Sequence, residues 1–177
     1  MAPPKEVAGS LKDRLASIRS YFGKRRGRKR RKIALLVDGP NMLRKEFEID
    51  LGEIKEMLRD FGDIRVGKVF LNQFASEKLI QAVENQGFEV VISTSDVDVP
   101  MAIAGMEMIY NDNIDTLALV TRDTDFKPLV LKAREKGKTT IVFGAEEGLS
   151  HALKNAADYV VVLKKNKEFE ILGAEEG

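Results

Sequence analysis

The 177-residue sequence contains no cysteine, a single histidine and no long hydrophobic run. Without cysteine the chain forms no disulfide and no cysteine-ligated zinc or iron–sulfur site, and thiol catalysis is excluded. One histidine, His151, is too few for a multi-histidine metal site. No apolar stretch approaches the roughly 18 residues that a membrane helix requires, and the first ten residues lack the apolar segment of a secretory signal. We therefore expect a cytoplasmic protein without a membrane span.

Motifs that bind phosphate through glycine-rich loops are also missing. The sequence has no Gly-x-Gly-x-x-Gly, no Gly-x-x-x-x-Gly-Lys-Ser/Thr and no Asp-x-Asp directly after its first apolar strand. Each of these motifs places backbone N–H groups or carboxylates around a phosphate. Their absence makes a nucleotide-binding domain or a phosphatase a weaker hypothesis.

The formal net charge of +1 conceals two oppositely charged parts. Residues 1–32 carry 12 lysines and arginines against two acidic residues, whereas the remaining 145 residues carry 17 basic against 26 acidic residues. Such asymmetry concerns binding partners more than fold. We divide the chain into a basic arm (1–32), a globular domain (33–163) and a C-terminal tail (164–177), in which "KEFEIL" could add an edge strand.

The basic arm combines a short amphipathic pattern with a run of positive charge. "SLKDRLASIRSYF" has apolar residues at helical spacing, and eight of the nine residues in "KRRGRKRRK", residues 24–32, are basic. Its best use is to bind nucleic-acid phosphates with little sequence readout. Two alternatives stay open: the arm folds back on the acidic globule, or it lies on a membrane surface. The residues expected to contact RNA are Lys24, Arg25, Arg26, Arg28, Lys29, Arg30, Arg31 and Lys32.

Short apolar runs alternate with longer amphipathic stretches from residue 33 onward. The predicted strands are 33–37, 65–71, 88–93, 116–121, 139–143 and 158–163, and the predicted helices lie near 50–61, 75–86, 99–111, 125–136 and 147–156. Gly87 and Gly137 lie just past their helices, where a left-handed residue is favoured. Strands that alternate with helices indicate an α/β fold with a mostly parallel sheet covered on both faces.

Acidic residues follow three of the predicted strands. Asp38 follows the first strand, Asp96 and Asp98 follow the third, and Asp123 and Asp125 follow the fourth. Parallel sheets place their functional groups outside the carboxyl ends of the strands. If the first and fourth strands are neighbours, all three loops open onto one cleft.

Several carboxylates in one cleft favour a divalent cation, because like charges disfavour one another's ionised forms. Oxygen ligands suit Mg²⁺ or Mn²⁺, and such ions activate water and stabilise charge on a phosphodiester. Asn41 could orient a ligand or a water, and Arg122, Lys127 or Ser150 could hold a substrate phosphate. The simpler alternative is that each residue caps a helix or lies in a turn, as Asp123 could before the helix near residue 125.

The same residues resemble the motifs of the NYN domains in the PIN-like ribonuclease superfamily, in particular their LabA-like archaeal and bacterial branch. The resemblance covers about residues 33–163, and no single motif is specific by itself. The motifs are Asp38 with Asn41, then Val97-Asp98-Val99, then Asp123, Asp125 and Phe126 within "TRDTDF", and finally Ser150, Leu153, Ala157 and Asp158.

The resemblance implies a three-layer, Rossmann-like fold with a sheet of order 3-2-1-4-5. It also implies RNA cleavage that depends on Mg²⁺ or Mn²⁺, with Asp38, Asp98, Asp123 and Asp125 as metal ligands. One departure is Ala104, where many relatives carry a further aspartate.

Asp96 could compensate for this loss, and Glu107 is a weaker candidate. A second departure is Arg122, which stands where a small residue is usual. Arg122 could contact a substrate phosphate, or it could form a salt bridge with a nearby acidic residue.

Two functional hypotheses follow from these patterns. The first is a metal-dependent ribonuclease, endonucleolytic by preference, whose catalytic residues are Asp38, Asn41, Asp98, Asp123 and Asp125. The second is a catalytically weak or inactive RNA-binding module on the same fold. The sequence is compatible with a homo-oligomer in either case.

Overall fold

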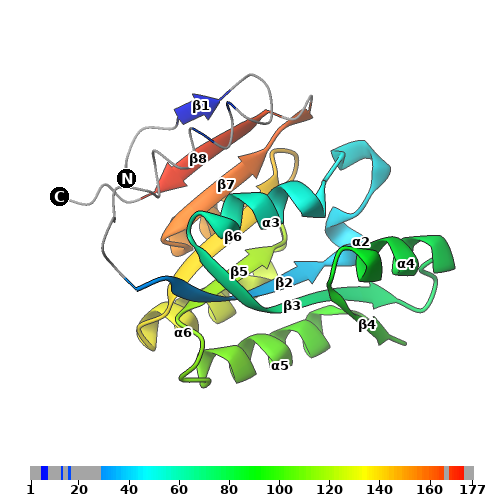
Figure 1. The fold of residues 1–177 in the computed structure, drawn as a ribbon, viewed down its shortest axis with the longest axis horizontal. Helices are drawn as coiled ribbons and strands as arrows, with labels where there is room; N and C mark the ends of the chain where they lie inside the picture. The colour runs from blue at the N-terminus through cyan, green and yellow to red at the C-terminus, as the bar shows by residue number, and fades with distance from the viewer. Residues whose placement is uncertain (1–4, 8–12, 14–15, 17–28, 166–167, 174–177) are drawn as a thin grey trace.

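The computed structural model describes residues 5–7, 13, 16, 29–165 and 168–173. Within these residues one sheet of eight strands runs through the molecule in the order β1-β8-β7-β6-β5-β2-β3-β4 (Figure 1). The strands are β1 (Lys5–Val7), β2 (Arg31–Asp38), β3 (Gly62–Asn72), β4 (Glu89–Ser93), β5 (Thr116–Val120), β6 (Thr139–Ala145), β7 (Tyr159–Leu163) and β8 (Phe169–Gly173).

The central part of this sheet has the predicted order. Strands β2, β3, β4, β5 and β6 are the first to fifth strands of the globular domain, and their arrangement confirms the order 3-2-1-4-5. All pairings from β4 to β7 are parallel, and β8 and β1 are added antiparallel. The "KEFEIL" segment therefore forms a strand as expected, but β1 rather than β8 is outermost.

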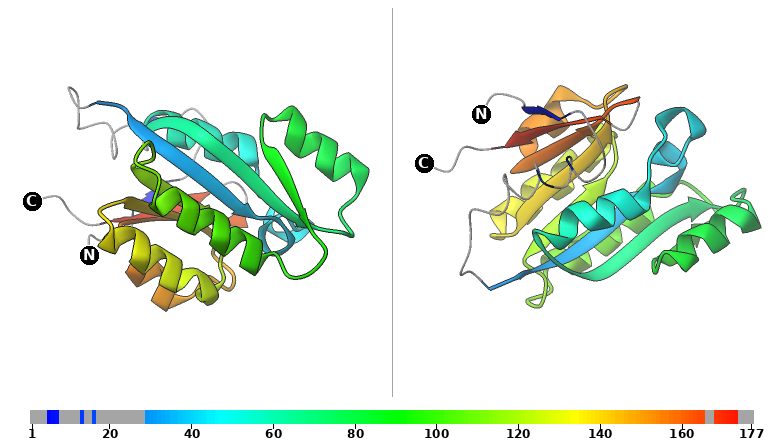
Figure 2. Two further views of the ribbon diagram at one scale, coloured as in Figure 1. Left: turned by 90° about the horizontal axis from the view of Figure 1, so that it is seen from below. Right: turned by 45° about the horizontal axis from the view of Figure 1, so that its top comes forward.

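Helices cover both faces of the sheet (Figure 2). Helices α3 and α4 contribute to the hydrophobic cluster on one face, and α5, α6 and α7 contribute to the cluster on the other. Along β2 the buried side chains alternate between these two clusters, which explains why the strand reads as one continuous apolar run. The helical elements are α2 (Gly39–Met42), η1 (Lys45–Phe47), α3 (Leu51–Arg59), α4 (Glu77–Asn85), α5 (Asp98–Ile109), η2 (Thr124–Phe126), α6 (Lys127–Glu135) and α7 (His151–Ala156).

The ends of several helices follow from local signals. Asp50 caps α3 by accepting hydrogen bonds from the backbone N–H groups of Gly52 and Glu53. Gly87 and Gly137 adopt φ values of +87° and +80°, as expected for residues that end helices. Two predicted helices are shorter than expected: the segment from 125 divides into η2 and α6, and the segment from 147 becomes helical only at His151.

The last two residues of the basic arm, Arg31 and Lys32, are the first two residues of strand β2. Strand β2 begins at Arg31, two residues before the predicted start. The prediction relied on apolar runs, and the charged residues Arg31 and Lys32 do not belong to one. The Arg31 guanidinium lies 4.7 Å from the centre of the Phe61 ring, and Arg30 Nε is 2.9 Å from an Asp63 oxygen. The amphipathic helix predicted within residues 10–22 falls almost entirely outside the described residues.

Candidate metal centre

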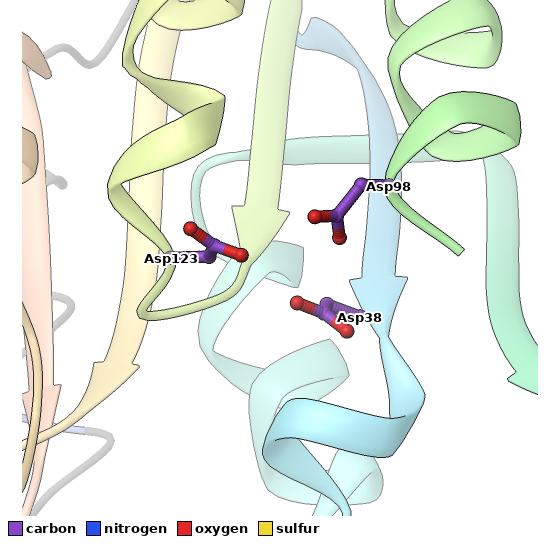
Figure 3. A group of neighbouring side chains, drawn as sticks. All are labelled: Asp38, Asp98 and Asp123. Carbon is purple, nitrogen blue, oxygen red and sulfur yellow. The ribbon is translucent and has the colours of Figure 1, made fainter. Parts of the chain in front are cut away.

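Three carboxylates from distant parts of the chain meet at the carboxyl-terminal edge of the sheet. Asp38 ends β2, Asp98 begins α5, and Asp123 lies just beyond β5. Strands β2 and β5 are parallel neighbours, so their following loops open on the same side. Figure 3 shows the three side chains turned toward one another, and each offers an oxygen that lies within 4.8 Å of the others.

Asp38 is the buried member of this carboxylate triad, with 2% of its surface exposed. The Thr121 hydroxyl donates a hydrogen bond of 3.1 Å to Asp38 Oδ2 and accepts one of 3.1 Å from the Asp123 backbone N–H. Burial raises the pKa of Asp38, hydrogen bonds from Thr121 and Asn41 oppose that rise, and the charge of Asp123 adds to it. Thr121 thereby fixes Asp38 and Asp123 relative to each other.

Asp98 has a pKa raised to about 6, first because of partial burial and then because of the negative charges of Asp96, Asp123, Asp38 and Asp125. Its backbone N–H donates a 3.0 Å hydrogen bond to Asp96 Oδ1, which holds the turn that starts α5. A divalent cation among these groups would remove the repulsion that raises this pKa.

The triad lies in an open cavity of about 370 Å³. Among the residues that the structure describes, Arg44 is the only basic one that lines the cavity. The cavity thus offers negative charge for a cation in its depth and a single positive charge on its wall. Its lining residues are Asp38, Pro40, Asn41, Arg44, Asn72, Ser95, Asp96, Val97, Asp98 and Asp123.

Arg122 is held beside this cavity by three different groups. Its Nε donates a 2.9 Å hydrogen bond to Asn41 Oδ1, and its Nη1 donates one of 3.2 Å to the Glu147 carbonyl. The guanidinium carbon lies 4.6 Å from the centre of the Phe47 ring. Gly148 adopts a φ of +85°, and a Cβ at this position would lie 2.5 Å from Arg122 Nη1. Arg122 thus joins three loops of the rim through an amide, a carbonyl and a ring, rather than through an acidic side chain.

A comparison of the chain with known protein families shows which family it belongs to. The family described as NYN domain matches residues 32–164. This chain belongs to the NYN domain family. The NYN domain is part of the PIN-like ribonuclease superfamily, so the resemblance read from the motifs is confirmed at the family level.

The NYN domain described here is similar to two further proteins. Protein MJ0482 of Methanocaldococcus jannaschii, itself uncharacterized, is 60% identical over 148 residues, which cover 84% of this chain and 60% of that protein. This chain therefore spans about 60% of the length of its curated relative. The crystal structure of VPA0982 from Vibrio parahaemolyticus, a protein of unknown function, matches with a TM-score of 0.69 at 22% identity. The match covers 78% of this chain and 96% of VPA0982, and this similarity supports the α/β fold described above.

The NYN domain brings some of the other predicted site residues close to the triad and leaves others apart. Asp96 lines the cavity, whereas Asp125 is exposed in η2 and is not one of the three converging carboxylates. Lys127 is the first residue of α6 and does not line the cavity. Ser150 caps α7, since its hydroxyl accepts a 3.0 Å hydrogen bond from the Leu153 backbone N–H.

The position of the missing family aspartate lies in the core. Ala104 is buried in the hydrophobic cluster that α5 forms with α6. Glu107 is exposed on α5 and lies about 13 Å beyond Asp98 along the helix axis, at 1.5 Å per residue. Of the two acids considered as substitutes for that aspartate, Asp96 is the one that reaches the cavity.

The described residues of the basic run lie at the other end of β2. Arg31 begins this strand and Asp38 ends it, which separates them by about 23 Å at 3.3 Å per residue. Lys29 and Arg30 directly precede the strand, whereas Lys24, Arg25, Arg26 and Arg28 lie outside the described residues. No helix in the described part of the chain is long and apolar enough to cross a membrane.

Three residues of the site were missed by the sequence reading. Thr121 is a fully buried polar residue directly after β5, Arg44 lines the cavity from the loop between α2 and η1, and Asn72 lines it from the last position of β3. Thr121 directly precedes the "RDTDF" part of the third motif, and its position after an apolar strand was the available signal. Arg44 and Asn72 had none, because their place depends on how α2 and β3 end in space.

Proposed function

We propose that this NYN domain is a metal-dependent ribonuclease that cleaves RNA phosphodiesters endonucleolytically. The observation that carries the proposal is the convergence of Asp38, Asp98 and Asp123 within 4.8 Å in an open cavity. Membership of a nuclease superfamily supports the same reaction class. The cavity is open, so a phosphate of a polymer can enter it from solvent.

The donor set of the cavity fits Mg²⁺ or Mn²⁺. All three triad residues offer carboxylate oxygens, the ligand type that these hard cations prefer. When bound, such an ion supplies positive charge opposite the phosphodiester and lowers the pKa of water. Asp38, Asp98 and Asp123 would hold it, and Asp96, which lines the same cavity, is the candidate for a further oxygen.

The remaining polar residues of the site orient this triad and the substrate. Thr121 aims the Asp38 carboxylate, and the Asn41 amide lies between Asp38 and Arg122. Arg44 is placed to contact a phosphate oxygen, because it is the basic residue of the cavity wall. The basic arm would bind RNA phosphates outside the cavity and raise the local RNA concentration near an otherwise acidic domain.

The activity is tested with purified protein, single-stranded and structured RNAs and Mn²⁺. The wild type should cleave, and Asp123→Asn should lower the rate by at least about a hundredfold, because a metal ligand is lost. Asp112→Asn, the same change at an exposed turn residue outside the cavity, serves as the matched control and should leave the rate unchanged. Equal cleavage by wild type and Asp123→Asn would assign the activity to a contaminant.

Metal binding is tested separately by calorimetric titration with Mn²⁺. Asp38→Asn and Asp98→Asn should each weaken binding strongly, since each removes one of the converging oxygens. Binding that survives both substitutions unchanged would locate the metal elsewhere and remove the basis of the proposed reaction.

A catalytically inactive RNA-binding module is the second candidate, and the burial of Ala104 in the core favours it. Because this position supplies no carboxylate, the site has fewer acidic ligands than many relatives. This candidate requires RNA binding with a steep salt dependence and no metal-dependent cleavage. Cleavage that responds to Asp123→Asn would exclude it.

A further inference from the structure

Phe74 is the one exposed phenylalanine among those in the described part of the chain. Its side chain is 84% exposed, whereas Phe47, Phe70, Phe88, Phe126, Phe143 and Phe169 are each at most 8% exposed. Removal of a phenyl ring from water stabilises a fold, and this ring forgoes that stabilisation. A lone apolar residue on a surface needs no explanation by itself, so its position decides whether it has a use.

Phe74 directly follows a segment that lines the cavity of the carboxylate triad. It follows β3 by two residues, and Asn72, the last residue of that strand, lines the cavity. Asn72 pairs with Ser93 of β4, whose following loop contributes Ser95 and Asp96 to the same cavity. The connection from β3 to α4 (Figure 1) therefore starts at a residue that lines the cavity.

The loop that carries Phe74 is tightly held. The Phe74 backbone N–H donates a 3.0 Å hydrogen bond to Asn72 Oδ1, and the Ala75 N–H donates one of 3.1 Å to the Asn72 carbonyl. Directly after the turn, the Ser76 hydroxyl caps α4 by accepting a 3.1 Å bond from the Leu79 N–H. An aromatic ring on such a turn is presented to solvent with little backbone entropy left to lose on binding.

Arg44 complements this ring on the cavity wall. Its Nε donates a 3.2 Å hydrogen bond to the Pro40 carbonyl, and its Nη1 lies 3.8 Å from a Glu46 oxygen. Half of the side chain is exposed, so guanidinium N–H groups are left to contact a phosphate. Arg44 on the cavity wall thus offers a cation for a phosphate, and Phe74, two residues beyond the lining residue Asn72, offers an exposed face for a base.

We propose that Phe74 is a base-stacking contact of the site, with one unpaired base on its ring and a neighbouring phosphate at Arg44. This inference rests on the proposed action on RNA and assigns a substrate contact to it. In a duplex both faces of each internal base are covered by its neighbours, so an aromatic side chain stacks only on an unpaired base. Stacking on a ring tolerates any base, so sequence preference from this contact is weak.

The absence of tryptophan from the chain allows a direct test. Phe74→Trp introduces a single tryptophan whose emission is quenched when a base stacks on it. The measurement uses this substitution in an Asp123→Asn background with Mg²⁺, so that RNA is bound without being cleaved. Tyr110→Trp in the same background is the control, because Tyr110 is 62% exposed and follows α5 about 18 Å along the axis from Asp98.

A fluorescein-labelled oligouridylate decamer is titrated, and its anisotropy reports binding independently of tryptophan emission. We expect the Phe74→Trp emission to be quenched over the concentration range in which the anisotropy rises. A blunt-ended RNA duplex without a loop or an abasic ribose-phosphate decamer should not quench it, and Tyr110→Trp should respond to none of the three. In the same background, Phe74→Ala should weaken binding of the decamer roughly fivefold to 150-fold, and Phe74→Tyr should retain it.

Decamer binding without a change in Phe74→Trp emission would overturn the inference, as would equal quenching by the blunt-ended duplex. An anisotropy that never rises would overturn it too. Cleavage by the wild type is measured separately, so the two failures are distinguishable. Cleavage without quenching leaves the nuclease and removes the stacking contact, whereas quenching without cleavage leaves a single-strand binding module.

Discussion

At the scale of single residues, Asp98 carries an unfavourable charge in the metal-free protein. Its pKa is raised to about 6 by partial burial and by the charges of neighbouring aspartates. Between the ordinary aspartate pKa and this value the folded state binds more protons than the unfolded state. The free energy of unfolding therefore falls as the pH rises through that interval and stays lower above it.

The first prediction concerns the stability of the metal-free protein. Asp98→Asn removes a penalised charge, so it should raise the melting temperature at pH 7 in EDTA by roughly 2–4 °C, the effect of about 1 kcal/mol once solvent screening of a partly exposed group is allowed for. At pH 4.5 the wild-type Asp98 is mostly protonated in the folded state, and the gain should nearly vanish. Thermal unfolding at the two pH values checks this, and an equal gain at both would contradict it.

The pH dependence of metal binding should have the opposite sign. A carboxylate must be ionised to bind Mn²⁺, so a group with a pKa of about 6 should make the affinity rise about tenfold from pH 5 to pH 7 and then level off. Calorimetry at a series of pH values measures this rise. Asp98→Asn should bind more weakly and with a flatter profile, and a wild-type affinity that does not change with pH would count against Asp98 as a ligand.

Substitution of Arg122 tests whether this residue, which lies beside the cavity, positions the site or binds the substrate. Its Nε holds Asn41 Oδ1, and Asn41 is hydrogen-bonded to Asp38. Arg122→Gly should therefore weaken Mn²⁺ binding roughly tenfold, the lower end of what outer partners of metal ligands contribute. Arg122→Lys should not restore it, because an ammonium lacks the planar fork that reaches Asn41 and the Glu147 carbonyl together. Weaker RNA binding with unchanged Mn²⁺ affinity would identify a phosphate contact instead.

At the scale of secondary-structure elements, the sequence predicted the strands and helices of the globular domain because each buries a continuous run or stripe of apolar residues. The sheet order came from the resemblance, and the parallel β2–β5 pairing then brought Asp38 and Asp123 together. The start of β2 was missed because Arg31 is charged yet paired with Gly62 in the sheet. Arg44 and Asn72 were missed because residues in a loop or at the end of a strand are not marked by the hydrophobic periodicity of the sequence.

Helix α5 carries Asp98 as its first residue, and at Gly105 it packs closely against Leu129 of α6. A Cβ at Gly105 would lie 2.5 Å from a terminal carbon of Leu129, so a side chain there must push the two helices apart (Figure 2). Gly105→Val should destabilise the fold by about 1–3 kcal/mol and weaken Mn²⁺ binding, because α5 moves with its first residue. Urea unfolding and calorimetry measure both effects.

The matched control for this helix is Ala102→Val. Ala102 lies on a half-exposed side of α5, where the larger side chain has room. Its cost should stay below about 1 kcal/mol, which reflects helix propensity alone. If Gly105→Val leaves both stability and Mn²⁺ affinity at the level of this control, the close packing of α5 does not position the site.

At the scale of the whole molecule, positive charge is concentrated in one terminal segment while the NYN domain is acidic. The C-terminal part of that segment is structural, since Arg30 pairs with Asp63 and Arg31 stacks on Phe61. Strand β1, at Lys5–Val7, pairs with β8, so deletion of the segment would also remove a strand. The RNA-binding role of the arm is therefore better tested by neutralising charges that precede Arg30.

Neutralisation of Arg25, Arg26 and Arg28 to glutamine should flatten the salt dependence of RNA binding. Each phosphate contact with single-stranded RNA contributes about 0.7 to the slope of log K against log salt, so the slope should fall by roughly 2. In the control, three exposed lysines outside the arm, Lys78, Lys136 and Lys165, are changed to glutamine, which removes the same net charge. Anisotropy titrations of an oligouridylate at several salt concentrations give both slopes. If the two triple variants lose the same slope, RNA responds to the net charge of the molecule, and the arm is not a separate binding element.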